Sequence, residues 1–425
     1  MSKPILPAAT GHPKAVWPSI FAGFCASLIG IGLARFAYTP LLPVLIQAHW
    51  FAASDVVYLG AANLAGYLVG AVLGRPLAAG LGNVTALRAM KVLVTLAFLA
   101  CAFPVSTSWF FIWRLLSGIA GGVIMVLVAA TVLPNVPDDQ KGLATGAVFL
   151  GLGCGIAASG TIVPLLLKFG LRETWIGLAA LSAILTAASW RGWPRRAVPA
   201  TGQTATTLSS GPNAFIRVLY LQYAFMAAGL VPAMIFLVDF IARGLESGAA
   251  LGSRFWVLYG VGAMIGPPLY GVFADRLGAR RALRLILSVQ AIALAALAAA
   301  NNYLLIGLLT VMIGSFPPGI IPPVLARVRE IVPGNAVRQN AIWSRATTVF
   351  AASQALSGYA SSAIFNSFGG NYRCLFLMSA VAIASALLAD FASLRWRVRE
   401  PLSEVSTSTC PEQLDGPRMM AADAV

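Results

Sequence analysis

Two arginines of this sequence stand inside long apolar segments, where a charged side chain is costly and tends to serve a function. Arg35 lies in the apolar segment 17–46 and Arg114 in the segment 109–133. A guanidinium can hold a carboxylate by two parallel hydrogen bonds. Tyr38 adds a phenolic hydroxyl three residues after Arg35, on the same face of a helix. These residues favour recognition of a small organic anion or of a zwitterion with a carboxylate. The alternative is that both arginines extend to the lipid headgroups and only anchor their helices.

Other polar side chains in apolar segments are candidates for the same site. Gln222, Tyr223 and Gln354 are uncharged, and each is equally well explained by a hydrogen bond between helices. Asp239 is the acid best placed to carry coupling protons, because it lies within an apolar segment. Arg243 follows it by one helical turn and opposes that role, since a salt-bridged carboxylate tends to stay ionised.

Catalytic and metal chemistry have little support in the composition. The chain has two histidines and five cysteines, and the cysteines are far apart, without the spacing of a metal or redox site. A Ser/His/Asp set and a phosphate-binding loop are also missing from the sequence. We therefore expect no enzyme activity, no cofactor and no metal. The net charge of +15 suggests nucleic-acid binding, but the charges fall in loops between apolar segments, which favours a membrane topology instead.

The apolar segments themselves predict an all-α integral membrane protein. The chain is 59% hydrophobic and 10% charged, whereas soluble domains carry about 25% charged residues. About 20 apolar residues cross a bilayer as a helix. Twelve segments are near that length: 17–46, 56–81, 87–105, 109–133, 142–167, 174–193, 214–242, 255–274, 282–300, 303–328, 341–365 and 374–394.

The twelve segments divide into two halves. The expected domains are a lead (1–16), a six-helix half (17–193), a Thr/Ser/Gly/Pro-rich linker (194–213), a second six-helix half (214–398) and a disordered tail (399–425). Most lysines and arginines of the loops fall on one side of this arrangement. The other side carries Lys168, Arg172, Arg243, Arg254 and Arg373. The positive-inside rule then places both termini and the linker in the cytoplasm of a bacterial cell, with the helices in the inner membrane.

A charged hairpin between two apolar segments carries the most specific pattern. Residues 271–281 read Gly-Val-Phe-Ala-Asp-Arg-Leu-Gly-Ala-Arg-Arg. Gly271 and Gly278 allow close approach and a tight turn. Asp275 can bond the N-terminus of a nearby helix or pair with a neighbouring arginine, and the candidates are Arg276, Arg280 and Arg281. The positive-inside rule alone explains the arginines. The full pattern resembles the loop signature of the major facilitator superfamily, whose fold is twelve helices in two six-helix halves.

The first apolar segment narrows the resemblance. Residues 30–43 read Gly-Ile-Gly-Leu-Ala-Arg-Phe-Ala-Tyr-Thr-Pro-Leu-Leu-Pro. This pattern resembles the YbfB/YjiJ-like branch of the superfamily, and Phe236–Phe240, Trp256 and Gly260–Gly266 match that branch as well. Arg114 with its following glycines resembles the superfamily's signature in the fourth helix. The resemblance implies alternating access about a central cavity, with the hairpin around Asp275 as part of a cytoplasmic gate.

The function that we expect is secondary active transport of a small molecule, with protons as a candidate coupling ion. Membrane lipids would surround a monomer. The alternative is a non-transporting sensor or scaffold of the same fold, which would use the polar tail 400–425 to bind a partner protein.

Overall fold

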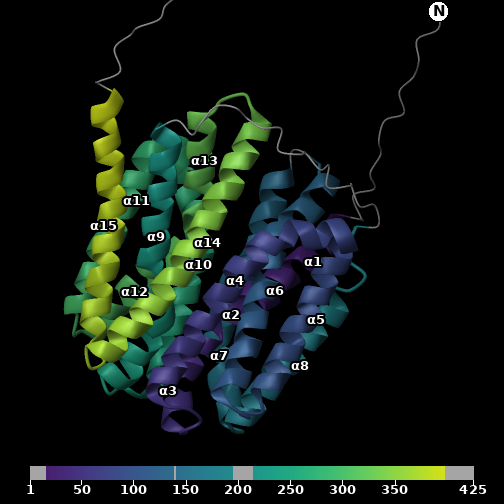
Figure 1. The fold of residues 1–425 in the computed structure, drawn as a ribbon, viewed down its shortest axis with the longest axis vertical. Helices are drawn as coiled ribbons and strands as arrows, with labels where there is room; N and C mark the ends of the chain where they lie inside the picture. The colour runs from purple at the N-terminus through teal and green to yellow at the C-terminus, as the bar shows by residue number, and fades with distance from the viewer. Residues whose placement is uncertain (1–15, 138–139, 195–213, 398–425) are drawn as a thin grey trace, which may run out of the picture.

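A computed structural model describes residues 16–137, 140–194 and 214–397. The expected tail, all but the first residue of the linker and all but the last residue of the lead lie outside the described residues. The described part is helical and holds no strand (Figure 1). Its main helices are α1 (Val16–Ser27), α2 (Ala34–Phe36), α3 (Tyr38–Gln47), α4 (Ala53–Leu81), α5 (Asn83–Cys101), α6 (Thr107–Val132), α7 (Lys141–Leu167), α8 (Leu171–Ala188), α9 (Ala214–Asp239), α10 (Gly248–Leu277), α11 (Ala279–Ala299), α12 (Tyr303–Gly319), α13 (Ile321–Ile331), α14 (Ala336–Ser367) and α15 (Tyr372–Arg397).

Ten of the described helical segments are long and apolar enough to cross a membrane. α12 and α13 together form an eleventh, with a bend of 43° between them. Pro317 and Pro318 lie in the last turn of α12, and Pro322 lies in the first turn of α13, so this bend has an evident cause. α14 occupies the place of the expected segment 341–365 and is 32 residues long, but its serines, threonines and amides make it less apolar. The expected count of twelve therefore rests on α14.

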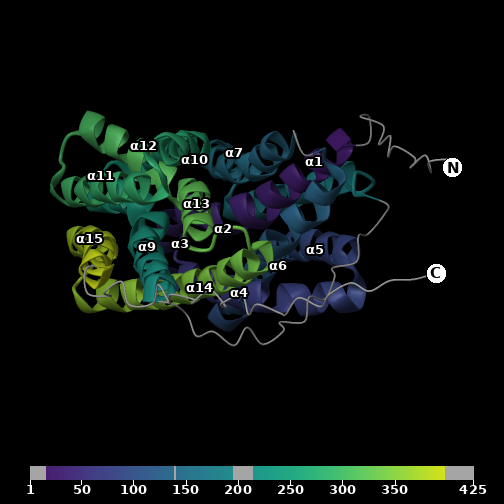
Figure 2. The same cartoon turned by 90° about the horizontal axis from the view of Figure 1, so that it is seen from above.

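The helices form two groups that lie side by side, α1 to α8 and α9 to α15 (Figures 1 and 2). α4 packs on α14, α7 packs on α10, and α3 packs on α9, so these pairs join the two groups. α5 and α8 pack on each other at the outer flank of the first group. One cluster of buried apolar side chains lies within the first group, and two larger clusters contain side chains of both groups.

The segment expected as one continuous helix over 17–46 is broken. A π-helical stretch, η2 (Leu28–Leu33), follows α1, and a further break at Ala37 separates α2 from α3. Pro40 contributes to the second break, because it has no N–H to bond the carbonyl of Phe36. Gly32 lies so close to Gly155 of α7 that a Cβ at Gly32 would be 2.7 Å from the Gly155 Cα. The glycine lets these two helices touch backbone to backbone.

The hairpin expected over 271–281 is much shorter in the structure. α10 continues to Leu277 and α11 begins at Ala279, so Gly278 alone makes the turn, with φ +80° and ψ 147°. Gly271 lies inside α10 and not in a turn. The first half repeats the same geometry at Gly82 between α4 and α5, with φ +79° and ψ 148°. This positive φ favours glycine strongly. The repeated turn is the clearest sign that the two halves share one plan.

Candidate functional site

Arg35 lies where the two halves meet. Its guanidinium is half-buried and sits 4.4 Å from the centroid of the Tyr67 ring, from α4 of the same half. Its Nη2 donates a long hydrogen bond of 3.4 Å to Oε1 of Gln354, from α14 of the other half. Among the described residues no carboxylate pairs with Arg35. The cation is thus held by a ring face and one weak bond, and it retains donors for a further acceptor.

Arg114 is placed differently from Arg35, although both come from apolar segments. It is fully buried in the first half, its Nη1 donates to the carbonyl of Ala34 at 2.7 Å, and its guanidinium lies 4.4 Å from the centroid of the Tyr38 ring. The break around Ala37 leaves that carbonyl available for a side-chain donor. Arg114 therefore ties α6 to the irregular part of the first segment, beside the interface between the halves.

Tyr38 does not join Arg35, which corrects the expectation that both share one helix face. Its hydroxyl donates to the carbonyl of Val56 at 2.6 Å, and its ring packs on Arg114. The physical reason is the break at Ala37, since a spacing of three residues gives a common face only in an unbroken helix. The aromatic partner of Arg35 is Tyr67.

Sequence reasoning missed Tyr67 and Tyr259. Tyr259 of α10 is fully buried in the second half, stacks on Trp256 with ring centroids 4.6 Å apart, and lies within range of the Arg35 charge. Its hydroxyl has no hydrogen-bond partner among the described residues. Trp256 donates to Ser159 of α7 at 3.0 Å. A signal for Tyr259 was its position three residues after Trp256, which already matched the family pattern; Tyr67 had no such signal.

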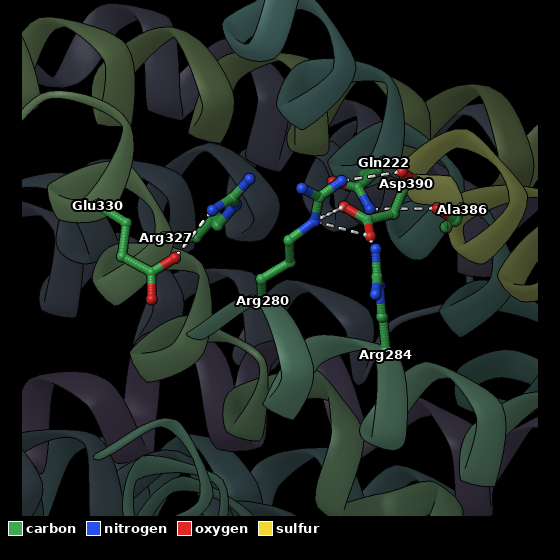
Figure 3. Close-up of polar contacts among 7 residues, drawn as sticks. All are labelled: Gln222, Arg280, Arg284, Arg327, Glu330, Ala386 and Asp390. Carbon is green, nitrogen blue, oxygen red and sulfur yellow. Dashed lines mark hydrogen bonds and ion pairs between the residues drawn. The ribbon is translucent and has the colours of Figure 1, made fainter. Parts of the chain in front are cut away.

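The uncharged candidates divide between the interface and the interior of the second half. Gln354 is buried beside Arg35, and its Nε2 points to the sulfur of Met234 at 4.0 Å. Tyr223 is buried against the ring of Phe350, with centroids 4.5 Å apart. Gln222 donates to the carbonyl of Ala386 at 3.2 Å (Figure 3). That bond joins α9 to α15, so Gln222 serves helix packing and lies away from Arg35.

Asp239 is fully buried at the end of α9 and has three donors around it. Arg243 donates to both carboxylate oxygens, and the hydroxyl of Tyr372 donates to Oδ2 at 2.7 Å. The segment that follows Asp239 is π-helical, η5 (Phe240–Gly244). The expected pair with Arg243 is present, and Tyr372 adds a bond from α15 that the sequence did not indicate.

The charged residues at the turn between α10 and α11 make bonds other than the expected ones. Asp275, Arg276 and Arg281 are exposed, and no ion pair involving them occurs among the described residues. Arg280 instead binds Asp390 of α15, with its Nε 3.1 Å from each carboxylate oxygen, and Arg284 binds the same carboxylate at 2.6 Å (Figure 3).

The start of α11 is bonded by Glu330 of α13, a role for which Asp275 was the expected residue. Oε1 of Glu330 accepts from the backbone N–H of Ala279 at 2.8 Å, and Oε2 accepts from Arg327 at 2.8 Å (Figure 3). Glu330 and Asp390 thus fix α11 to α13 and α15. We call this side of the bundle the basic end; α15 finishes there, uppermost in Figure 1.

The two halves bond each other at mid-height and toward the end opposite the basic end. Thr39 donates to the carbonyl of Met234 at 2.7 Å, and Ser362 of α14 donates to the carbonyl of Val57 at 3.4 Å. The other side-chain bonds between halves are Arg35 to Gln354, Trp256 to Ser159 and Cys154 to Met264. At the basic end, no such bond joins the halves among the described residues.

The fold of this chain is similar to the folds of several transporters of known structure. The chain has the fold of a D-xylose–proton symporter (14% identity, TM-score 0.72, covering 87% of this chain and 97% of that one). The nucleoside transporter NupG is also similar (15% identity, TM-score 0.68, 89% and 99% covered). So is a bacterial homologue of the human lysosomal transporter Spinster, in an inward-facing, unoccupied conformation (14% identity, TM-score 0.69, 90% and 98% covered).

These likenesses establish the fold, and the sequence itself establishes the family. The family model described as "Uncharacterised MFS-type transporter YbfB" matches residues 27–390, which is most of the chain. The match includes Arg35, Arg114, Asp239 and the turn at Gly278. The protein is an integral membrane member of the major facilitator superfamily and belongs to the YbfB-type transporter family.

Proposed function

We propose that the protein transports a small organic anion, or a zwitterion with a carboxylate, by alternating access across a bacterial inner membrane. The observation that carries this proposal is Arg35, a half-buried cation at the interface between the halves without a carboxylate partner among the described residues. A charge in that position is costly unless water or a ligand compensates it. A carboxylate would bind it with two parallel hydrogen bonds.

The rest of the site suits an anion of modest size. Tyr67 covers one face of the Arg35 guanidinium, and Gln354 and Tyr259 approach from the other half. A ligand bound here contacts both halves at once, which is what a rocking transporter needs of its substrate site. The unpaired hydroxyl of Tyr259 supplies one more donor near the guanidinium.

The orientation of the cycle follows from charge. The basic end carries most loop lysines and arginines, so we place it and both termini in the cytoplasm. Within the part of the chain that the structure describes, the side-chain bonds between the halves lie at mid-height and toward the opposite end, which supports an inward-open state. Closure at the basic end would then complete the cycle, with Asp275, Arg276 and Arg281 free to bond the first half there.

The topology is tested by reporter fusions. Fusions after Ser210 and after Val425 should both report a cytoplasmic location, and a periplasmic signal from either would reject this topology.

Transport itself is tested with the purified full chain in proteoliposomes. Small carboxylates, amino acids, sugars and nucleosides are screened first by thermal shift and then by flux, with and without a pH gradient.

Arg35→Lys keeps the charge but loses the planar pair of donors, so affinity for a carboxylate should fall about tenfold or more. Arg254→Lys, at an exposed arginine of α10, is the matched control and should leave affinity unchanged. A cationic substrate, or unchanged affinity in Arg35→Lys, would overturn the anion proposal. The absence of flux for every compound would favour the sensor or scaffold.

A further inference from the structure

A groove lies on the flank of the first half, away from Arg35. It is formed between α5 and α8 and has a volume of about 590 Å³, within the roughly 300–1,000 Å³ of small-molecule sites. α8 ends at this groove, so the groove lies near the basic end of the bundle. Neither the Arg35 site nor the turn at Gly278 contributes a residue to it.

The walls of the groove are apolar and open to the bilayer. Val92 and Leu96 of α5 are 39% and 47% exposed, as expected for side chains that face lipid. Ala183 and Ala187 line the opposite wall from α8, and their small side chains leave the space between the helices unfilled. A narrow apolar furrow of this kind, parallel to the helices, suits an acyl chain.

The end of the groove nearest the basic end carries polar groups. Arg191 lines it and is exposed, and Trp190 beside it is 39% exposed. Arg88 donates twice to the carbonyl of Trp190, at 3.1 and 2.7 Å, and lies 5.0 Å from the centroid of the Trp190 ring. Tryptophan and arginine together at one level are typical of the headgroup region.

Thr186 is the observation that points to a ligand. It lines the groove one turn before Trp190, it is only 6% exposed, and its hydroxyl has no hydrogen-bond partner among the described residues. The hydroxyl oxygen itself is covered in this structure, so an acceptor in the groove reaches it only when the side chain turns toward the groove. A buried hydroxyl without a partner is costly, and pairing with such an acceptor would remove that cost. The ester carbonyl of a phospholipid lies at this depth, just below its phosphate.

Charge selects the class of lipid. Arg88, Lys91 and Arg191 gather near this end of the groove. The sequence has no Asp or Glu in residues 83–101 or 174–194, which form the two walls and the segment after them. A headgroup with net negative charge is therefore favoured over a zwitterionic one.

We propose that the groove between α5 and α8 is a specific site for one anionic phospholipid. Its acyl chain lies along Val92, Leu96 and Ala187. Its ester carbonyl accepts from Thr186, and its phosphate binds Arg191 and Arg88. This site is independent of the transported substrate.

The test uses the purified, delipidated full chain and two probes, phosphatidylglycerol and phosphatidylcholine with identical acyl chains. Native mass spectrometry counts bound lipid, and thermal shift measures the stabilisation. Wild type should retain one phosphatidylglycerol that phosphatidylcholine does not displace. Ala187→Phe fills the groove and should abolish that adduct. Thr186→Val and Arg191→Gln should each weaken it, the latter by about tenfold, as expected from losing a charge-assisted hydrogen bond.

Two control variants stay outside the groove. Ile184→Phe adds bulk to a 65% exposed position of the same helix, and Arg172→Gln removes a cation at its other end. Both should bind phosphatidylglycerol as wild type does. Equal retention of the two lipids, or retention of phosphatidylglycerol by a folded Ala187→Phe variant, would each overturn the proposal. If Ala187→Phe does not fold, wild-type affinity in both Thr186→Val and Arg191→Gln is the overturning result. Glycerol phosphate without acyl chains should give no thermal shift, and a shift equal to that of the lipid would identify an anion site instead.

Discussion

The guanidinium of Arg35 lies 4.4 Å from the centroid of the Tyr67 ring. The ring attracts the cation without using any of its N–H donors, so Arg35 is positioned and still free to bind. The guanidinium of Arg114 lies at the same distance, 4.4 Å, from the centroid of the Tyr38 ring. Arg114 differs because it donates a hydrogen bond to the carbonyl of Ala34 and is fully buried. Arg35 and Arg114 are thus held by tyrosine rings in the same way and differ in their access to the interface between the halves.

Replacing Tyr67 tests whether its ring positions Arg35. Tyr67→Leu removes the ring face, which is worth about 0.5–2 kcal/mol, so substrate affinity should fall roughly 2- to 30-fold. Tyr67→Phe keeps the face and should bind nearly as wild type. Both are measured by calorimetric titration with the substrate found in the flux screen. Equal losses in the two variants would show that the hydroxyl, and not the ring face, contributes the binding energy.

Replacing Arg114 should affect stability more than binding. Arg114→Gln leaves the carbonyl of Ala34 without its charged donor, which costs about 1–3 kcal/mol. We expect a lower Tm in detergent, with flux per folded molecule reduced less than in Arg35→Gln. Flux lost in Arg114→Gln at an unchanged Tm would instead place Arg114 in the substrate site.

The ion pairs at the basic end predict different roles for two acids, a structural role for Asp390 and a gating role for Asp275. Asp390 is buried and binds Arg280 and Arg284, so Asp390→Asn should lower stability by an amount near the lower end of about 3–5 kcal/mol. Asp275 is exposed and unpaired among the described residues, so Asp275→Asn should leave Tm unchanged. If Asp275 bonds the first half when the basic end closes, its replacement should still reduce transport sharply. Full flux in Asp275→Asn at normal protein level would reject the gating role.

Proton coupling is tested at Asp239. Asp239→Asn keeps the shape but removes the charge that binds Arg243 and Tyr372. If the carboxyl carries the coupling proton, accumulation driven by a pH gradient should be lost, while exchange of labelled for unlabelled substrate continues. Tyr372→Phe, which removes one donor and keeps the acid, should preserve the accumulation. Gradient-driven accumulation in Asp239→Asn would exclude this residue as the carrier.

The two positive-φ turns give a prediction about stability alone. Gly82→Ala and Gly278→Ala each force a side chain into an extended conformation with positive φ that is populated almost only by glycine, at a cost of about 1–3 kcal/mol. Gly80→Ala is the control, because Gly80 is helical and a Cβ there meets nothing within 4 Å. Thermal unfolding should place both turn variants below wild type and the Gly80→Ala variant at or above it. A stable Gly278→Ala protein would show that the turn relaxes to another geometry.

The fold class and the family of this protein could be predicted from its sequence, because they depend on local patterns of residues. Long apolar segments, loop charges and the pattern at residues 271–281 predicted a helical membrane protein of the major facilitator superfamily, and the family match confirms that prediction. The Asp239–Arg243 pair was also readable, since residues four apart face each other within one helix. Each of these features depends on composition or on neighbours within a single element.

Contacts between elements required the tertiary structure. Tyr38 was expected beside Arg35, but the break at Ala37 turned it toward Arg114, and a helical periodicity cannot foresee a break in its own helix. Arg280 was expected near Asp275, yet the packing of α11 on α15 gave it Asp390. Tyr67 reached Arg35 only because α4 packs beside the first segment. Side-chain type and spacing determined which residues were capable of binding, whereas helix packing decided which of them meet, because partners far apart in the chain are brought together only by the folded backbone.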